Sequence, residues 1–136
     1  MTRKEQAIML HHNGFNCAQS VACSFCNVMG ADPETTFRLA EALGFGMGNM
    51  GTCGAVSAMA LVTGMKISDG NLDHPATKKE CYQMMQKLIA EFTEKNGSII
   101  CREIKGVDTG KVLRSCDGCI EAAVALLAKY LLGIEE

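Results

Sequence analysis

The stretch TCGAVSAMALVTGM, residues 52–65, decides the fold class, because apolar side chains cover every face of the helix that it would form. From Ala55 to Val62 a single serine interrupts the Ala, Val, Met and Leu side chains, so no polar stripe is left to face water. Thr52 is a suitable N-cap at its start. A helix of this kind belongs in the centre of a bundle, and we therefore predict an all-α protein with a central apolar helix.

Helical signals extend along nearly the whole chain. Asn16 with Gln19 three residues later, and Asp32 followed by Pro33, are typical helix starts. No useful length of apolar–polar alternation predicts a strand. Helices are expected over residues 3–12, 16–29, 32–43, 52–65, 77–95 and 116–132, and within residues 98–115 only CREIKG predicts a helical turn. We expect one compact helical bundle of about six helices, forming a single domain over residues 1–136.

Charge and hydropathy restrict the partners and the compartment. The net charge is -2 and no basic block occurs, so neither nucleic acid nor an anionic membrane surface is an expected partner. The first residues lack the apolar core of a signal peptide, and no run of about 18 apolar residues predicts a membrane span. We predict a cytoplasmic protein that is not itself in the membrane. In the reducing cytosol, eight cysteines indicate metal binding or redox chemistry rather than structural disulfides.

Helix geometry predicts a packing role for three of the cysteines. Cys23 and Cys26 lie three residues apart on the face opposite Cys17 and could form a local pair, but free cysteine is also a common small core residue. Two apolar stripes containing cysteine are expected to face the core: Cys17, Val21, Phe25 and Val28, and Cys81, Met85, Leu88 and Phe92.

The other four cysteines have neighbours that suggest chemistry. Cys53 falls at the start of a predicted helix, where backbone N–H groups stabilise a thiolate, which favours metal ligation or nucleophilic chemistry. The local sequence agrees equally well with a small buried residue at a tight helix entrance. Cys101 precedes Arg102, whose cation would lower the thiol pKa if the two side chains meet. Cys116 and Cys119 form CDGC, a spacing that lets two sulfurs share a metal or form a redox dithiol.

Several other motifs do not predict a phosphate-binding or metal-binding site. GFGMGNMG at residues 44–51 has the glycines of a phosphate loop, but no strand precedes it and no Gly-Lys-Ser/Thr ends it. The nine methionines are scattered as adaptable core filling. His11 and His12 suit the end of a helix, His74 lies in a turn, and none is spaced as a ligand pair.

Taken together, the cysteines resemble a known pattern. GFNCAQSV around Cys17, GTCGAVSAM around Cys53, CREI at Cys101, and Cys116 before an alanine-rich helix resemble the C-GCAxxG-C-C family of redox-active proteins. The resemblance spans nearly the whole chain from the first helix to the last. The family's cysteine-bearing domain is also similar to part of the split-Soret cytochromes, which carry haem and an iron–sulfur centre; neither C-x-x-C here is followed by histidine, so no haem is expected.

The resemblance implies that Cys17, Cys53, Cys101 and Cys116 are the functional set, with Cys119 a possible extra ligand. One departure is Ala58, which stands where the family's central element ends in glycine. A methyl group there should tighten helix contact rather than abolish it, while leaving the sulfur chemistry unchanged.

Three functions remain open for this set of cysteines. The first is an iron–sulfur cluster for electron transfer, because four cysteines is the ligand count that such a cluster needs. The second is thiol–disulfide exchange by Cys53 or by the Cys116/Cys119 pair. The third is a zinc- or copper-binding module, associated with a transporter because family members are often encoded near transporters. We expect a redox partner. The sequence identifies no catalytic residue, and it leaves open whether the protein forms a homodimer.

Overall fold

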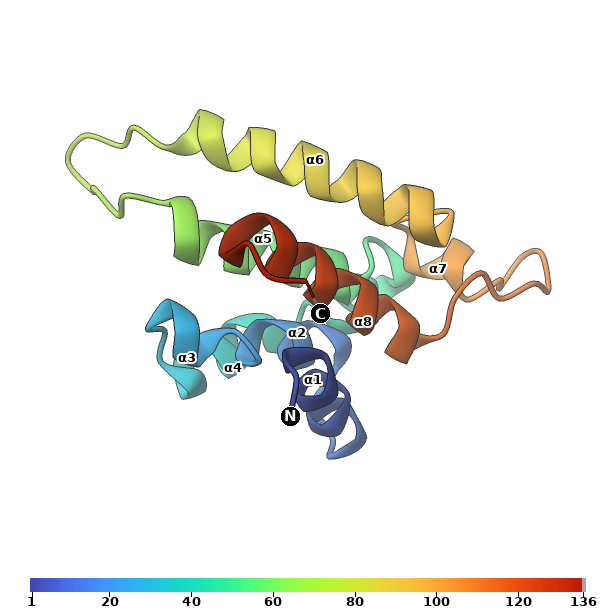
Figure 1. Cartoon of the computed structure of the whole chain (residues 1–136). Coiled ribbons are helices and arrows are strands. Elements are labelled where there is room, and N and C mark those ends of the chain that lie inside the picture. Colours follow the sequence, from blue (N-terminus) through green and yellow to red (C-terminus); the bar gives the residue numbers. More distant parts are fainter. Residues whose placement is uncertain (136) are drawn as a thin grey trace.

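The computed structural model describes residues 1–135, and helices account for nearly all of its regular structure (Figure 1). In these residues the one β-type contact is an isolated bridge between Thr52 and Ile100. The elements are α1 (Arg3–His12), α2 (Cys17–Cys23), α3 (Cys26–Met29), α4 (Pro33–Glu41), the wide turn η1 (Gly46–Met50), α5 (Gly54–Ile67), α6 (Lys78–Asn96), α7 (Cys101–Ile104), α8 (Cys116–Leu127) and its wider final turn η2 (Ala128–Leu132). The all-α prediction is confirmed.

Side-chain caps fix most of the predicted helix starts. The Asn16 side chain accepts from the backbone N–H of Gln19 at 2.9 Å, and Gln19 reaches back to the N–H of Asn16. The Asp32 carboxylate accepts from Thr35 N–H at 2.8 Å. Such reciprocal contacts satisfy backbone donors that a helix leaves unpaired at its N-terminus. The prediction of these two starts is therefore confirmed.

The predicted continuous helix over residues 16–29 is wrong, because it breaks into α2 and α3. The Ser24 hydroxyl donates to the carbonyl of Val21 at 2.7 Å, and Phe25 N–H bonds to Ala22 rather than one residue further back. Both contacts compete with the regular helical pattern. The register shift buries Cys26 and leaves Val28 46% exposed, so Val28 does not continue the stripe of Val21 and Phe25, which are buried as expected.

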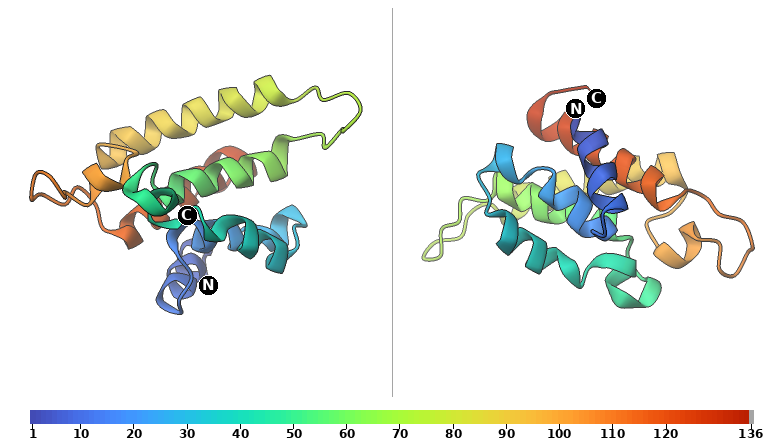
Figure 2. Two further views of the ribbon diagram at one scale, coloured as in Figure 1. Left: turned by 180° about the vertical axis from the view of Figure 1, so that it is seen from behind. Right: turned by 90° about the horizontal axis from the view of Figure 1, so that it is seen from below.

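The apolar segment forms α5, which packs against α2, α6 and α8. Its N-cap is Cys53 rather than Thr52, because Thr52 pairs with Ile100 instead of turning into the helix. In Figures 1 and 2, α6 runs beside α5, α8 crosses them, and α1–α4 lie on the other side of α5. The largest fully buried side chains come from these packed helices and from the turn between α2 and α3: Phe25, Phe92, Met59, Leu88 and Ile120.

No helix within residues 1–135 has both the length and the apolar character needed to cross a lipid bilayer.

Candidate sulfur-lined redox site

Five cysteines line one pocket of about 140 Å³. Cys17 comes from the start of α2, Cys53 from the N-cap of α5, Cys101 from the start of α7, and both Cys116 and Cys119 from the first turns of α8. The structure thus brings all four cysteines named from the sequence to one place, together with Cys119 of the CDGC motif. The remaining wall of the pocket is formed by His11, Asn16, Phe45, Gly46, Gly54, Ile104, Lys105 and Arg114.

Two backbone hydrogen bonds hold Cys53 and Cys101 beside each other. Cys53 N–H donates to the carbonyl of Ile99 at 2.7 Å, and Cys101 N–H donates to the carbonyl of Gly51, also at 2.7 Å. They flank the bridge between Thr52 and Ile100. The entrances to α5 and α7 are therefore tied together by main-chain contacts, which are insensitive to side-chain identity.

The glycine-rich segment before Cys53 forms the turn η1, which allows the backbone to come close to Cys101. Gly46 has φ +57°, and a Cβ atom there would lie 2.4 Å from the nitrogen of Gly51 and 2.9 Å from the Cβ of Cys101. Phe45 and Met47 also have positive φ, at 54° and 59°, a conformation that costs a non-glycine residue about 1–2 kcal/mol. Such strain persists only where the surrounding structure enforces it, and it often accompanies functional sites. Gly46 therefore allows the close backbone approach beside Cys101.

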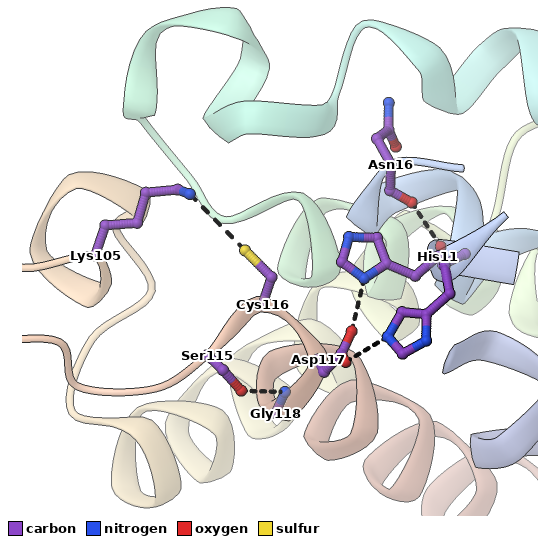
Figure 3. Close-up of polar contacts among 9 residues, drawn as sticks. His11, Asn16, Lys105, Ser115, Cys116, Asp117 and Gly118 are labelled. Atoms are coloured by element: carbon purple, nitrogen blue, oxygen red, sulfur yellow. Dashed lines mark hydrogen bonds and ion pairs between the residues drawn. The ribbon is translucent and has the colours of Figure 1, made fainter. Parts of the chain in front are cut away.

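Contacts with neighbouring side chains favour the thiolate form of Cys116. The thiol of Cys17 donates a hydrogen bond to the Cys116 sulfur, which lowers the pKa of Cys116 against the opposing effect of burial. The ammonium group of Lys105, 3.8 Å away, and the nearby His11 lower this pKa further (Figure 3). The same hydrogen bond, with burial, raises the pKa of Cys17 far above its usual range. The two thiols therefore titrate as a coupled pair, in which the pKa of Cys116 is lowered and that of Cys17 is raised.

A second pair has the same character. The Cys119 thiol donates to the sulfur of Cys53, which lowers the pKa of Cys53 against burial, and backbone N–H groups in the first turn of α5 lower it further. The pKa of Cys119 is raised by that hydrogen bond and by burial. Each sulfur of the CDGC motif is thus paired with a cysteine of another helix rather than with its neighbour in the motif.

The condition under which Arg102 would lower the pKa of Cys101 is not met, because the two side chains do not interact. The guanidinium group of Arg102 turns away and forms two hydrogen bonds with the Asp108 carboxylate, at 2.8 and 2.9 Å. Burial raises the pKa of Cys101, and the cation that opposes this effect is Lys105. Lys105 lies four residues after Cys101, on the same face of a helical turn, and this spacing is the signal that could have found it.

His11 and His12 form a polar cluster that the sequence did not indicate. The Nδ1 of His11 and the Nε2 of His12 each lie 2.7 Å from a different oxygen of Asp117, the residue after Cys116. These contacts lower the pKa of the Asp117 carboxyl. Figure 3 shows His11 reaching Asp117 from beside the Cys116 side chain. No local sequence pattern predicts this contact, because the two histidines and Asp117 are more than 100 residues apart in the chain.

The remaining cysteines lie outside the pocket. Cys26 is buried with its sulfur 3.8 Å from the carbonyl of Ala22, and Cys23, at the end of α2, has its pKa raised to about 11 by burial and by the neighbouring Cys26. Cys81 lies partly exposed on α6, in the stripe with Leu88 and Phe92. All eight cysteines are free thiols.

Comparison with known proteins gives one match. A search of curated proteins and a search of solved structures each returned nothing similar. Residues 15–130 match the family described as "Putative redox-active protein (C_GCAxxG_C_C)". The matched range includes all five pocket cysteines and α2 through α8. This protein belongs to the C-GCAxxG-C-C family of redox-active proteins.

Proposed function

We propose that the protein is an electron-transfer protein in which Cys17, Cys53, Cys101 and Cys116 hold an iron–sulfur cluster, with Cys119 as a fifth sulfur beside it. The observation that carries the proposal is the meeting of cysteines from four separate elements around one pocket. A dithiol enzyme needs only two neighbouring cysteines, whereas a cluster needs four ligands. Bound there, the cluster would supply one-electron chemistry, and the chain would supply ligands, charge and shielding from water.

The spacing of the sulfurs favours a cluster over a single zinc or copper ion. Four thiolates around one zinc ion, at Zn–S distances of about 2.3 Å, lie roughly 3.8 Å from one another. Among residues 1–135, no three cysteine sulfurs lie within 4.8 Å of one another. In a [4Fe–4S] cluster each of the four cysteines binds a different iron, so their sulfurs are more widely spread. The cysteine sulfurs around the pocket are the ligand type that an iron–sulfur cluster requires.

The charges around the pocket suit an anionic centre. Lys105 places a cation beside Cys116, and the N-terminus of α5 points its positive dipole end at Cys53. Phe45 and Ile104 supply apolar walls. Burial and hydrogen bonding to sulfur are the levers by which a protein adjusts the potential of such a cluster.

Anaerobic purification provides the direct test. We expect brown protein with stoichiometric iron and sulfide and an electron paramagnetic resonance signal in one redox state. C53S should abolish iron binding, whereas C81S, which replaces a cysteine outside the pocket, should retain it. Colourless and iron-free protein after reconstitution under reducing conditions would refute the cluster.

Cys101 and Cys119 separate the proposed ligand from the fifth sulfur. We expect C101S to lose iron and C119S to keep it. The opposite result would exchange these two cysteines in the ligand set. Full iron content in both variants would argue that neither is a ligand, and loss of iron in both would argue that both are.

The hydrogen-bonded pairs favour thiol–disulfide exchange as a second candidate. Each pair joins a cysteine with a lowered pKa to one with a raised pKa, Cys116 with Cys17 and Cys53 with Cys119, which favours a thiol and a thiolate in each pair. Forming a disulfide would release two electrons and one proton from a pair to an oxidised dithiol-type partner. Differential alkylation and mass spectrometry of the iron-free protein would identify reversible Cys17–Cys116 or Cys53–Cys119 disulfides, and their presence without iron in the native protein would favour this function.

A further inference from the structure

The structure assigns a metal site to His11, His12 and Asp117, at the edge of the cysteine pocket that His11 also lines. We propose that these side chains bind a divalent first-row transition ion, of the class of Zn²⁺ or Fe²⁺, that keeps open positions for water. One ligand atom from each residue lies within 4.8 Å of the other two. This inference does not depend on whether the cysteines hold a cluster.

The three donors come from two elements that meet in space. His11 and His12 are the last residues of α1, and Asp117 lies in the first turn of α8. These helices pack against each other along much of α1. Because the Ser115 side chain caps α8 through the N–H of Gly118, at 3.0 Å, the carboxylate of Asp117 is free to face the histidines (Figure 3). Both positions are therefore set by regular helices rather than by a loop.

The present contacts are close to the spacing of a coordination sphere. Nitrogen and oxygen ligands lie about 2.0–2.2 Å from zinc, so neighbouring donor atoms are roughly 3.0–3.4 Å apart. Each imidazole nitrogen now lies 2.7 Å from a carboxylate oxygen. An ion entering between them needs only a small outward movement of the rings, for which His12, with a 62% exposed side chain, has room. The proton of each neutral ring would move to its other nitrogen.

The donor chemistry selects the class of ion. Two imidazoles and one carboxylate suit zinc, iron, cobalt or nickel, and do not suit calcium or magnesium, which prefer oxygen ligands alone. Two-histidine, one-carboxylate sites with open positions are typical of non-haem Fe²⁺. The exposed fractions of His11 and Asp117, 25% and 36%, leave a side of the site open to water. A surface depression that His12 lines also includes Glu5 and Glu121, which add negative charge nearby.

Cobalt titration separates this site from the cysteines. Titrating the full chain and C53S with Co²⁺, we expect one equivalent with weak d–d absorption and no intense thiolate-to-cobalt band, present in both proteins. D117N, which preserves shape, and H12A, at an exposed position, should weaken this binding by about tenfold or more. H74A, a histidine in the loop between α5 and α6, should leave the affinity unchanged, and Zn²⁺ should displace the cobalt.

Three results would overturn the proposal. Unchanged affinity in D117N and H12A, both folded by circular dichroism, would show that these side chains form only an ion pair. Cobalt that always carries the thiolate band and is lost in C53S would place all metal at the cysteines. Failure of the full chain to bind Co²⁺ at micromolar concentrations would exclude the site.

Discussion

Replacing Gly46 by alanine tests whether close backbone approach builds the sulfur site. The added Cβ would lie 2.4 Å from the nitrogen and 2.8 Å from the oxygen of Gly51, and 2.9 Å from the Cβ of Cys101. Those Gly51 atoms already bond to the carbonyl of Gly46, at 2.9 Å, and to the N–H of Cys101, at 2.7 Å. Relieving the contact must move Gly51 and therefore disturb both hydrogen bonds.

The magnitude follows from these contacts. A side chain at φ +57° costs about 1–2 kcal/mol, and disturbing two hydrogen bonds adds about 1–3 kcal/mol. The smaller entropy of the unfolded alanine chain returns roughly 0.4–1 kcal/mol. We expect G46A to lower the free energy of unfolding by about 2–4 kcal/mol. Gly48 is the matched control, because its φ is +76° but nothing lies within 4 Å of its Cβ position. G48A should cost about 1 kcal/mol or less.

Urea denaturation of the reduced, iron-free proteins, followed by far-ultraviolet circular dichroism, measures both free energies without a contribution from bound metal. Alkylation of Cys101 in G46A should also be faster than in the parent protein, because the turn beside it is displaced. Equal destabilisation by G46A and G48A would refute the reasoning, since backbone strain alone would then explain both effects.

Three further substitutions test the electrostatics and the packing. K105M should move the pH midpoint of Cys116 alkylation upward by about one unit, because the Cys116 thiolate loses its neighbouring cation and forms only at higher pH. R102M should leave this midpoint unchanged. The alkylation rates are measured by mass spectrometry of the iron-free protein. A58G, which restores the family's glycine but removes a fully buried methyl group from α5, should cost about 1–2 kcal/mol in urea denaturation while iron content stays the same. F92A should cost about 3–5 kcal/mol in the same assay, because that ring is fully buried.

Helix starts could be predicted because their signals are local. Asn16 and Gln19 contact each other three residues apart, and Asp32 contacts Thr35 at the same spacing. Each cap can therefore be recognised from a few consecutive residues. The break at Ser24 was missed because a serine hydroxyl can either face water or bond back to the helix, and the surrounding packing decides which.

The site was predictable only as a set of residues, not as an arrangement. The resemblance named Cys17, Cys53, Cys101 and Cys116, but their meeting depends on the pairing of Thr52 with Ile100 and on the packing of α2, α5 and α8. Contacts between residues so far apart in the chain produce no periodic sequence pattern from which either residue could be predicted. Cys119 differs, since its position one turn after Cys116 on a helix already predicts that both sulfurs face the same way.

Protonation links the two functions considered for the pocket. Cys17, Cys101 and Cys119 have raised pKa values and carry protons in the metal-free protein, while Cys53 and Cys116 have lowered values. Ligation requires thiolates, so binding iron through Cys17 and Cys101 must release their protons, and loading becomes more favourable as pH rises. Disulfide formation needs only one thiolate in each pair to attack, and the lowered pKa values of Cys53 and Cys116 favour that form. The arrangement that would hold the proposed cluster would therefore also leave the metal-free pocket sensitive to oxidation.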